Sequence, residues 1–239
     1  MRPKYDLDTI KFSTDGPTWQ RAVGLFEKGK VTKFQEEVGG FSAIVMGTTP
    51  YHVRVSFDHH DHGSCDCYLG QKDEYCKHMI AVAIRAVHGD GRLSDQDKKF
   101  IDQPVSSGKR GTLDQAEQVA FKGAVTAAMR YIKSYDGPSR TWFAYQNSLD
   151  QGCNRLTALV SDLPASEQTA KLLVDLLLRL ERKLSFGVDD SNGTVGDFMM
   201  GAVEVLKAFA DLDPNCKRVF RILENTPTSF GWEEPLLRL

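Results

Sequence analysis

The feature that most constrains this chain is a short stretch holding four potential metal ligands, Cys65, Cys67, Cys76 and His78. They follow the spacing C-x-C, eight intervening residues, then C-x-H. Three thiolates and one imidazole form a complete tetrahedral shell for a single Zn²⁺ ion, with no position left for water or substrate. In a reducing compartment such thiols bind metal rather than form disulfides. We therefore predict one structural zinc ion and a role in recognition.

The ligand spacing also predicts the path of the backbone. Two ligands one residue apart cannot both face one metal from a helix, so the C-x-C pair is expected in an extended turn after Gly63. The C-x-H pair is expected where an apolar helix begins before Met79, because backbone N–H groups there stabilise thiolate charge. Zinc can contribute about 10–16 kcal/mol to the folding of such a site. The alternative interpretation is three buried free thiols and a surface histidine.

This pattern resembles the SWIM zinc finger, in which C-x-C is followed by a variable gap and C-x-H. The run Cys76-Lys77-His78 before an apolar helix is similar to the C-K-H of that family, and the resemblance covers roughly residues 15–88. SWIM fingers occur in proteins linked to chromatin-type ATPases, mutator-type transposases and recombination factors. The resemblance implies DNA binding or protein–protein contact, and it implies no single enzymatic activity.

Local patterns predict an α+β fold with a zinc-bound N-terminal domain over residues 1–90. A helix is expected over residues 18–28, followed by a meander of three strands over 31–38, 41–46 and 51–57. The last strand alternates apolar and polar side chains, which indicates that one face is buried. The zinc-bound turn and its helix complete this domain.

Residues 91–111 are rich in Gly, Pro and Ser and predict a linker. Residues 112–239 predict an all-α domain, either a helical bundle or an array of helical hairpins. Apolar stripes at helical spacing predict helices over residues 142–160, 164–184 and 195–212, with another after Pro214. For the first helix, the sequence predicts a capping box at residues 112–115 and a buried face rich in alanine, and Cys153 and Cys216 are expected as core residues.

Composition and charge limit the possible partners. Residues 1–90 hold 11 Lys and Arg against 12 Asp and Glu, whereas nonspecific DNA binders carry a basic surplus. No apolar run approaches the ~20 residues of a membrane span, and the first residues lack the apolar segment of a secretion signal. A cytoplasmic protein without membrane contact is therefore expected, and no small-molecule substrate is evident.

Three histidines, His59, His60 and His62, precede the ligands and raise the possibility of a second metal. Their spacing matches no known ligand pair, so an exposed polar loop is the alternative interpretation. The acidic run before Gly193 resembles a calcium loop, but an EF-hand alignment places Val188 and Met199 where oxygen ligands are needed. A polar turn that caps a helix is the better interpretation.

These observations predict a noncatalytic, zinc-stabilised binding protein whose SWIM module contacts DNA or a protein partner, with the helical domain as a second docking surface. The segment between Cys67 and Cys76 is expected to form a rigid tip, in which Tyr68 and Tyr75 either contact the partner or pack over the zinc. The expected partner is DNA or a protein, and an ATPase or helicase system is one candidate for the protein. The alternative is a zinc-dependent hydrolase or nuclease-associated subunit, although the sequence has no metalloprotease, nucleophile-elbow or P-loop motif.

Overall fold

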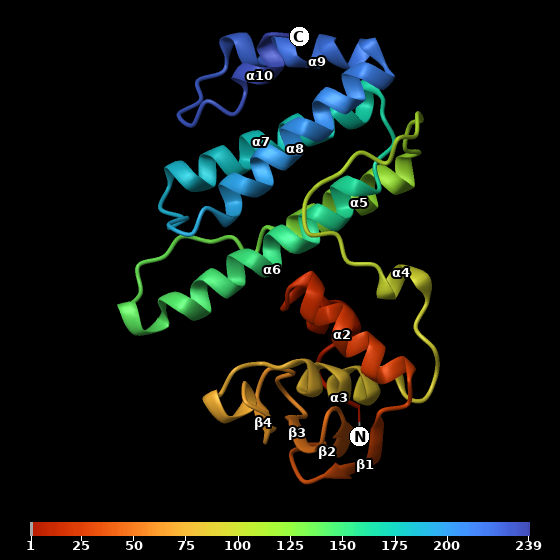
Figure 1. Cartoon of the computed structure of the whole chain (residues 1–239). Coiled ribbons are helices and arrows are strands. Elements are labelled where there is room, and N and C mark those ends of the chain that lie inside the picture. The colour runs from red at the N-terminus through yellow and green to blue at the C-terminus, as the bar shows by residue number, and fades with distance from the viewer. Residues whose placement is uncertain (1) are drawn as a thin grey trace. The chain divides into compact units, whose positions relative to one another are not determined.

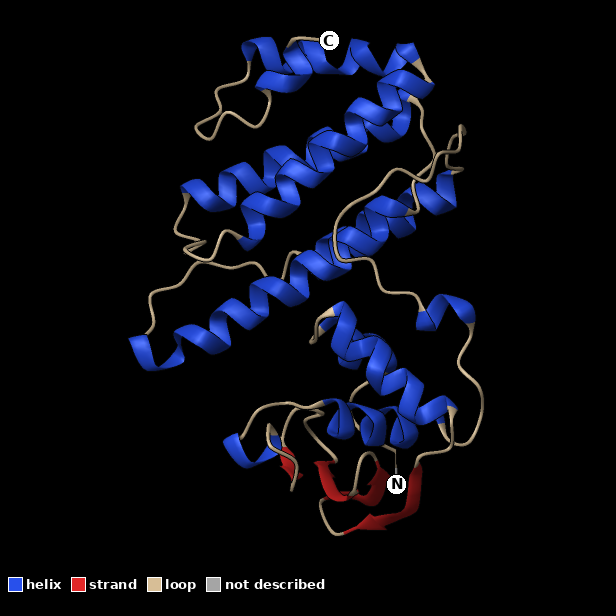
Figure 2. Ribbon diagram, in the orientation of Figure 1, coloured by secondary structure: helices blue, strands red, loops and turns tan. Residues whose placement is uncertain are grey.

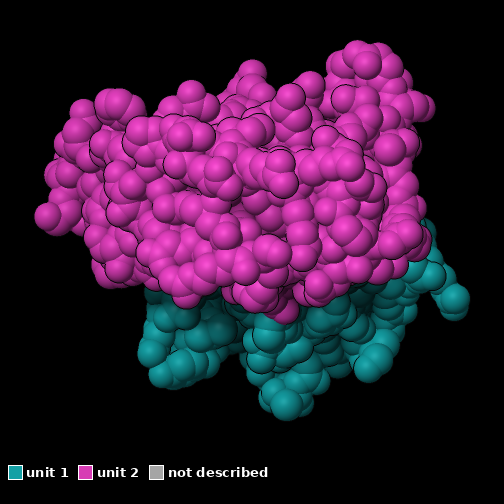
Figure 3. Space-filling model, turned by 90° about the horizontal axis from the view of Figure 1, so that it is seen from above, with its two compact units in different colours: residues 1–100 teal, residues 101–239 magenta. Residues whose placement is uncertain are grey.

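The computed structural model describes residues 2–239, and the chain divides after Phe100 into two compact units, shown in separate colours in Figure 3. We call residues 1–100 unit 1 and residues 101–239 unit 2. The boundary falls inside the segment predicted as a linker, and Leu93 from that segment is buried in the core of unit 1. The sheet lies in unit 1 and the long helices in unit 2 (Figure 2), so the predicted α+β class is confirmed.

Unit 1 contains an antiparallel sheet in which the strands follow one another in sequence order. Its strands are β1 (Val31–Glu37), β2 (Gly40–Met46), β3 (Pro50–Ser56) and β4 (Gly63–Cys65). The first three confirm the predicted meander. The short β4 was expected only as an extended turn, and it pairs with β3 immediately before the metal ligands.

Helices α3 and α2 stack on one face of this sheet, with α3 between α2 and the strands (Figure 1). The α-helices of unit 1 number four in the described residues. They are α1 (Leu7–Phe12), α2 (Gly16–Glu27), α3 (Lys77–His88) and α4 (Asp95–Lys98). Every residue of α3 from Met79 to Ile84 is buried. Ile80 and Ile84 join a cluster with α1 and α2, whereas Met79 and Val82 join a cluster with the sheet. A helix that is apolar on all sides fits a position between two layers.

Unit 2 is built from helices in chain order, with α5 beside α6, α7 beside α8 and the short C-terminal helices beyond them (Figure 1). They are α5 (Gln115–Ala128), α6 (Trp142–Ser161), α7 (Glu167–Ser185), α8 (Thr194–Leu212), α9 (Lys217–Phe220) and α10 (Glu234–Leu237). The buried apolar side chains of unit 2, which include Cys153 and Cys216, form one continuous cluster. Within residues 2–239, none of the helices is both long and apolar enough to cross a membrane.

The start and the buried face of α5 differ from the sequence prediction. The capping box joins Asp114 and Glu117, each of which accepts a hydrogen bond of 2.8 Å from the other's backbone N–H. The buried face carries Phe121, Val125 and Ala128, while the predicted alanines lie mostly in exposed positions. Larger apolar side chains lose more area from water on burial than alanine does, so they determine which face packs inward.

Candidate metal centre

The four predicted ligands, which come from three separate segments of unit 1, converge on one point. One donor atom from each of Cys65, Cys67, Cys76 and His78 lies within 4.8 Å of the other three. All four side chains are at most 7% exposed. In residues 2–239, no other group of three or more His, Cys, Asp or Glu side chains is placed to hold a metal.

The distances within this cluster fit a tetrahedral zinc ion. Nδ1 of His78 lies 3.7 Å from Sγ of Cys65 and 3.9 Å from Sγ of Cys76. A tetrahedron with Zn–S bonds of about 2.3 Å and Zn–N bonds of about 2.0 Å has edges of about 3.5–3.8 Å. These residues would therefore hold the ion through three sulfurs and the Nδ1 atom of one imidazole. A complete shell of this kind stabilises a fold and offers no open coordination position.

Strand β4 positions the first ligand by pairing closely with β3. Cys65 lies opposite Val53 in this ladder, and Gly63 lies opposite Val55. A Cβ atom added at Gly63 would fall 2.0 Å from the carbonyl oxygen of Arg54, so the two strands can approach this closely only because residue 63 is glycine. The strand therefore carries Cys65 inward to the cluster.

The turn after β4 positions Cys67 and supplies a hydrogen bond to its sulfur. The backbone N–H of Gly70 donates to Sγ of Cys67 at 3.4 Å. A Cβ atom added at Gly70 would lie 2.2 Å from the carbonyl oxygen of Cys65, which leaves no space for a side chain. Backbone donors aimed at a thiolate stabilise its charge and orient it toward a metal.

The start of α3 positions the remaining two ligands, as the sequence predicted. Cys76 is the N-cap residue with extended dihedral angles, and His78 lies in the first turn. The ring of His78 stacks on the ring of Tyr51, with centroids 4.4 Å apart and an interplanar angle of 27°. The stack and the helix together fix the direction in which Nδ1 points.

The two most closely coupled thiols, Cys65 and Cys76, have opposite pKa shifts. A hydrogen bond from the Cys65 thiol, followed by contributions from His78 and the backbone N–H of Met79, lowers the pKa of Cys76. The same hydrogen bond and burial raise the pKa of Cys65. Burial beside one thiolate makes it harder for the second thiol to lose its proton. A divalent cation overcomes this effect because it binds the deprotonated sulfur.

The neighbouring histidines do not form a second cluster with metal-ligand geometry. His59 and His62 are exposed, with ring centroids 4.8 Å apart, whereas His60 is buried against the rings of Tyr5 and Tyr75. Tyr75 therefore packs inside unit 1, and burial raises its pKa. Of the two tyrosines predicted for the tip, only Tyr68 lies on the surface, where 71% of it is exposed.

Sequence reasoning did not identify three groups that support the ligands. Asp66 accepts hydrogen bonds from the backbone N–H of His52 at 3.0 Å and from its ring at 3.1 Å, which ties the C-x-C turn to β3. The amide of Gly70 and the ring of Tyr51 are the other two. The only one of these groups that the sequence could have indicated is Gly70, because a glycine soon after the C-x-C pair suggests a tight turn. The contacts of Asp66 and Tyr51 depend on strand register.

The geometry defines a buried Cys3His zinc finger formed by a β-hairpin edge and a helix N-terminus. The SWIM zinc finger family matches residues 51–86, so this chain carries a SWIM zinc finger. The family match and the cluster together support a structural Zn²⁺ ion. Searches of curated proteins and of solved structures found no match to the chain. The matched residues all lie in unit 1, so the family match says nothing about unit 2.

Proposed function

We propose that this chain is a noncatalytic binding protein in which zinc fixes a recognition tip, residues 68–75, on the surface of unit 1. The observation that carries the proposal is the burial of all four donor side chains, which are at most 7% exposed. A zinc hydrolase needs a coordination position open to water and a route for substrate. A buried, four-donor shell offers neither, which disfavours the hydrolase and nuclease-associated alternatives.

The tip presents an aromatic and apolar surface on a backbone that is firmly held. Tyr68 is 71% and Leu69 40% exposed. The Lys72 ammonium donates to the Tyr68 hydroxyl at 2.6 Å and lies 4.3 Å from its ring centroid. The side chain of Gln71 donates to the carbonyl of Asp66 at 2.8 Å. An exposed tyrosine that is already ordered is typical of a protein-binding hot spot, because little side-chain entropy is lost on binding.

Charge favours a protein partner over DNA. The residues of unit 1 include 14 Lys and Arg and 14 Asp and Glu, so this unit has no basic surplus for binding phosphates. DNA remains the second candidate because Tyr68 and Lys72 together offer a ring for base stacking and a cation for phosphate. Within the protein class, an ATPase or helicase system is the first partner to test, because SWIM fingers are linked to such enzymes.

The test compares the purified chain with Tyr68→Ala and with the matched control Phe186→Ala, which removes an exposed aromatic ring from unit 2. Each variant is used to capture proteins from a lysate of the source cells, and zinc content is measured in parallel. We expect a specific partner that is retained by the wild type and by Phe186→Ala and is lost from Tyr68→Ala at unchanged zinc content. Equal capture by all three would contradict the proposal.

A gel shift with a 30-base-pair DNA duplex over a salt series separates the two partner classes. A protein partner predicts no stable shift at physiological salt. A shift that weakens steeply with added salt and disappears in Tyr68→Ala would establish DNA as the target instead.

A further inference from the structure

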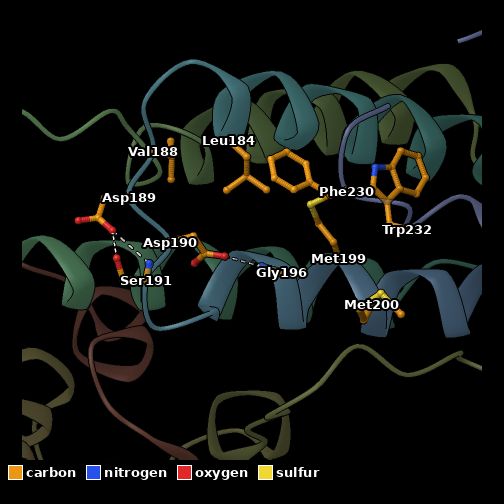
Figure 4. A pocket seen from close by; sticks show the side chains of 10 residues that line it. All are labelled: Leu184, Val188, Asp189, Asp190, Ser191, Gly196, Met199, Met200, Phe230 and Trp232. Atoms are coloured by element: carbon orange, nitrogen blue, oxygen red, sulfur yellow. Dashed lines mark hydrogen bonds between the residues drawn. The ribbon is translucent and has the colours of Figure 1, made fainter. Parts of the chain in front are cut away.

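Unit 2 contains a pocket of about 500 Å³ that the zinc finger does not explain (Figure 4). It lies between the end of α7, the connection from α7 to α8, the first turns of α8 and the segment that precedes α10. Figure 4 shows Leu184, Met199 and Phe230 gathered in its centre, with Asp189 and Asp190 at one end and Trp232 at the other. Its volume is in the range of sites that bind a small molecule or a few side chains.

One wall of the pocket is held in place by a buried carboxylate. Glu181 of α7 is 5% exposed and accepts hydrogen bonds from the backbone N–H of Ser229 at 2.7 Å and from the indole of Trp232 at 2.8 Å. Because Phe230 lies between these two anchored residues, its segment is fixed against α7. The pocket therefore exists before any ligand binds, which lowers the entropic cost of binding.

The acidic end of the pocket carries negative charge that no cation neutralises. Asp190 accepts hydrogen bonds from the backbone N–H groups of Val195 at 2.8 Å and Gly196 at 2.9 Å. Ser191 and then the indole of Trp142 donate to Asp189 and lower its pKa, so this carboxylate is ionised at neutral pH. All of these donors are neutral, and within residues 2–239 neither aspartate forms an ion pair. The pocket therefore complements a cation.

The apolar part of the pocket is open to solvent on one side. Phe230 is 55% exposed and Met200, on the rim, is 49% exposed, whereas Trp232 is 2% exposed. A small molecule is normally enclosed over most of its surface, whereas a side chain presented by another protein leaves one side of its pocket open. Methionine side chains also adapt readily to the shape of an inserted apolar group.

We propose that this pocket binds a short segment of a partner protein in which a large apolar residue lies next to Lys or Arg. The apolar side chain enters between Leu184, Met199 and Phe230, and the basic side chain faces Asp189 and Asp190. The match of a cationic residue to two unneutralised carboxylates beside an apolar cavity is the argument for this occupant. The proposal does not depend on the function of the zinc finger, because all of these residues belong to unit 2.

The experiment presents a displayed library of random heptapeptides to the zinc-loaded, full-length chain and measures the affinity of the enriched peptides. The pocket is blocked by Gly196→Leu, because a Cβ atom at this helical position meets only Asp190, at an ordinary 3.5 Å, and a longer side chain extends into the cavity. Leucine is also a better helix former than glycine, so the variant is expected to fold. The matched control is Gly123→Leu in α5, where a Cβ atom meets nothing within 4 Å.

We expect the enriched peptides to share a large apolar residue within two positions of Lys or Arg. Their affinity should fall at least ten-fold in Gly196→Leu and remain unchanged in Gly123→Leu. Replacing the peptide's basic residue by Gln should weaken binding by about two- to five-fold.

Three outcomes would overturn the proposal. They are the absence of enrichment, equal binding of the peptides to Gly196→Leu, and binding that does not depend on the basic residue. If 2-phenylethylamine raised the thermal stability of the wild type but not of Gly196→Leu while no peptide was enriched, the pocket would be assigned to a small organic amine instead.

Discussion

The two units of this chain are stabilised in different ways. In unit 1, α3 separates two small apolar clusters, and the three cysteines of the metal centre are themselves members of the cluster on the sheet side. In unit 2 the buried side chains of all six helices form one continuous cluster, with no candidate metal site among the described residues. Metal binding adds its free energy to the folding of the unit that supplies the ligands, whereas the continuous core of unit 2 gains nothing from the ion. We therefore expect metal removal to affect unit 1 alone.

The largest effect is expected from Cys76→Ser. This change removes one thiolate and one donor at the start of α3, so zinc binding worth about 10–16 kcal/mol to folding is largely lost. Hydrogen exchange read by mass spectrometry on the full-length chain should show unit 1 unprotected and unit 2 protected as in the wild type. Loss of protection in both units would mean that they fold as a single cooperative structure. The control, Cys153→Ser, alters a buried thiol of unit 2 and should leave the zinc content unchanged.

The opposite result is expected from Leu177→Ala, which truncates a fully buried side chain of α7. Loss of apolar contacts and the resulting cavity should reduce the stability of unit 2 by about 2–5 kcal/mol. Chemical denaturation, monitored by hydrogen exchange, should show this loss of stability in unit 2. One zinc ion per chain should still be bound. Zinc loss from this variant would show that the metal centre depends on the helical core.

A smaller effect on unit 1 is expected from Gly70→Ala. The added methyl group would lie 2.2 Å from the carbonyl of Cys65, so the turn must shift and the N–H bond to Cys67 must lengthen. Overpacking of this kind costs about 1–3 kcal/mol, and competition with a chelator should detect it as weaker zinc binding. The matched change Gly24→Ala in α2 meets nothing within 4 Å and should leave zinc affinity unchanged. Equal zinc affinity for both variants would contradict the assigned role of Gly70.

The smallest effect concerns the pH dependence of unit 1. Hydrogen bonds from the backbone N–H of Leu93 and then from Lys98 lower the pKa of Glu27 below its ordinary value of 4.5. A lowered pKa in the folded state means that the stabilisation is present above about pH 4.5 and is lost as the pH falls through the folded value. Glu27→Gln should make the stability of unit 1 depend less on pH on the acid side. Urea denaturation of the full-length chain over a series of pH values measures this dependence. An unchanged slope would contradict this assignment.

The sequence predicted local structure well wherever a pattern depends on neighbouring residues. The alternation in β3, the apolar run of α3 and the stripes of α6 to α8 all correspond to observed elements. The ligand spacing was informative because an extended turn and a helix start are the two local structures that bring such pairs to one ion. The four residues are brought together in the structure as that spacing requires.

Features that depend on distant contacts could not be predicted in this way. The half-buried position of Tyr75 depends on its packing against His60, and the buried face of α5 depends on the position of α6. The pocket of unit 2 combines Leu184 and Asp190 with Phe230, which is distant from both in sequence and meets them because Glu181 anchors the C-terminal segment. No periodicity or motif contains that information.

One zinc ion, bound by three sulfurs and one imidazole nitrogen, is expected to stabilise the fold of unit 1. X-ray absorption spectroscopy at the zinc edge on the purified, full-length chain tests it most directly. We expect one zinc per chain, three sulfur neighbours at about 2.3 Å and one nitrogen at about 2.0 Å. An exchangeable water oxygen in the shell, or fewer than three sulfur neighbours, would contradict this expectation. So would the absence of stoichiometric zinc.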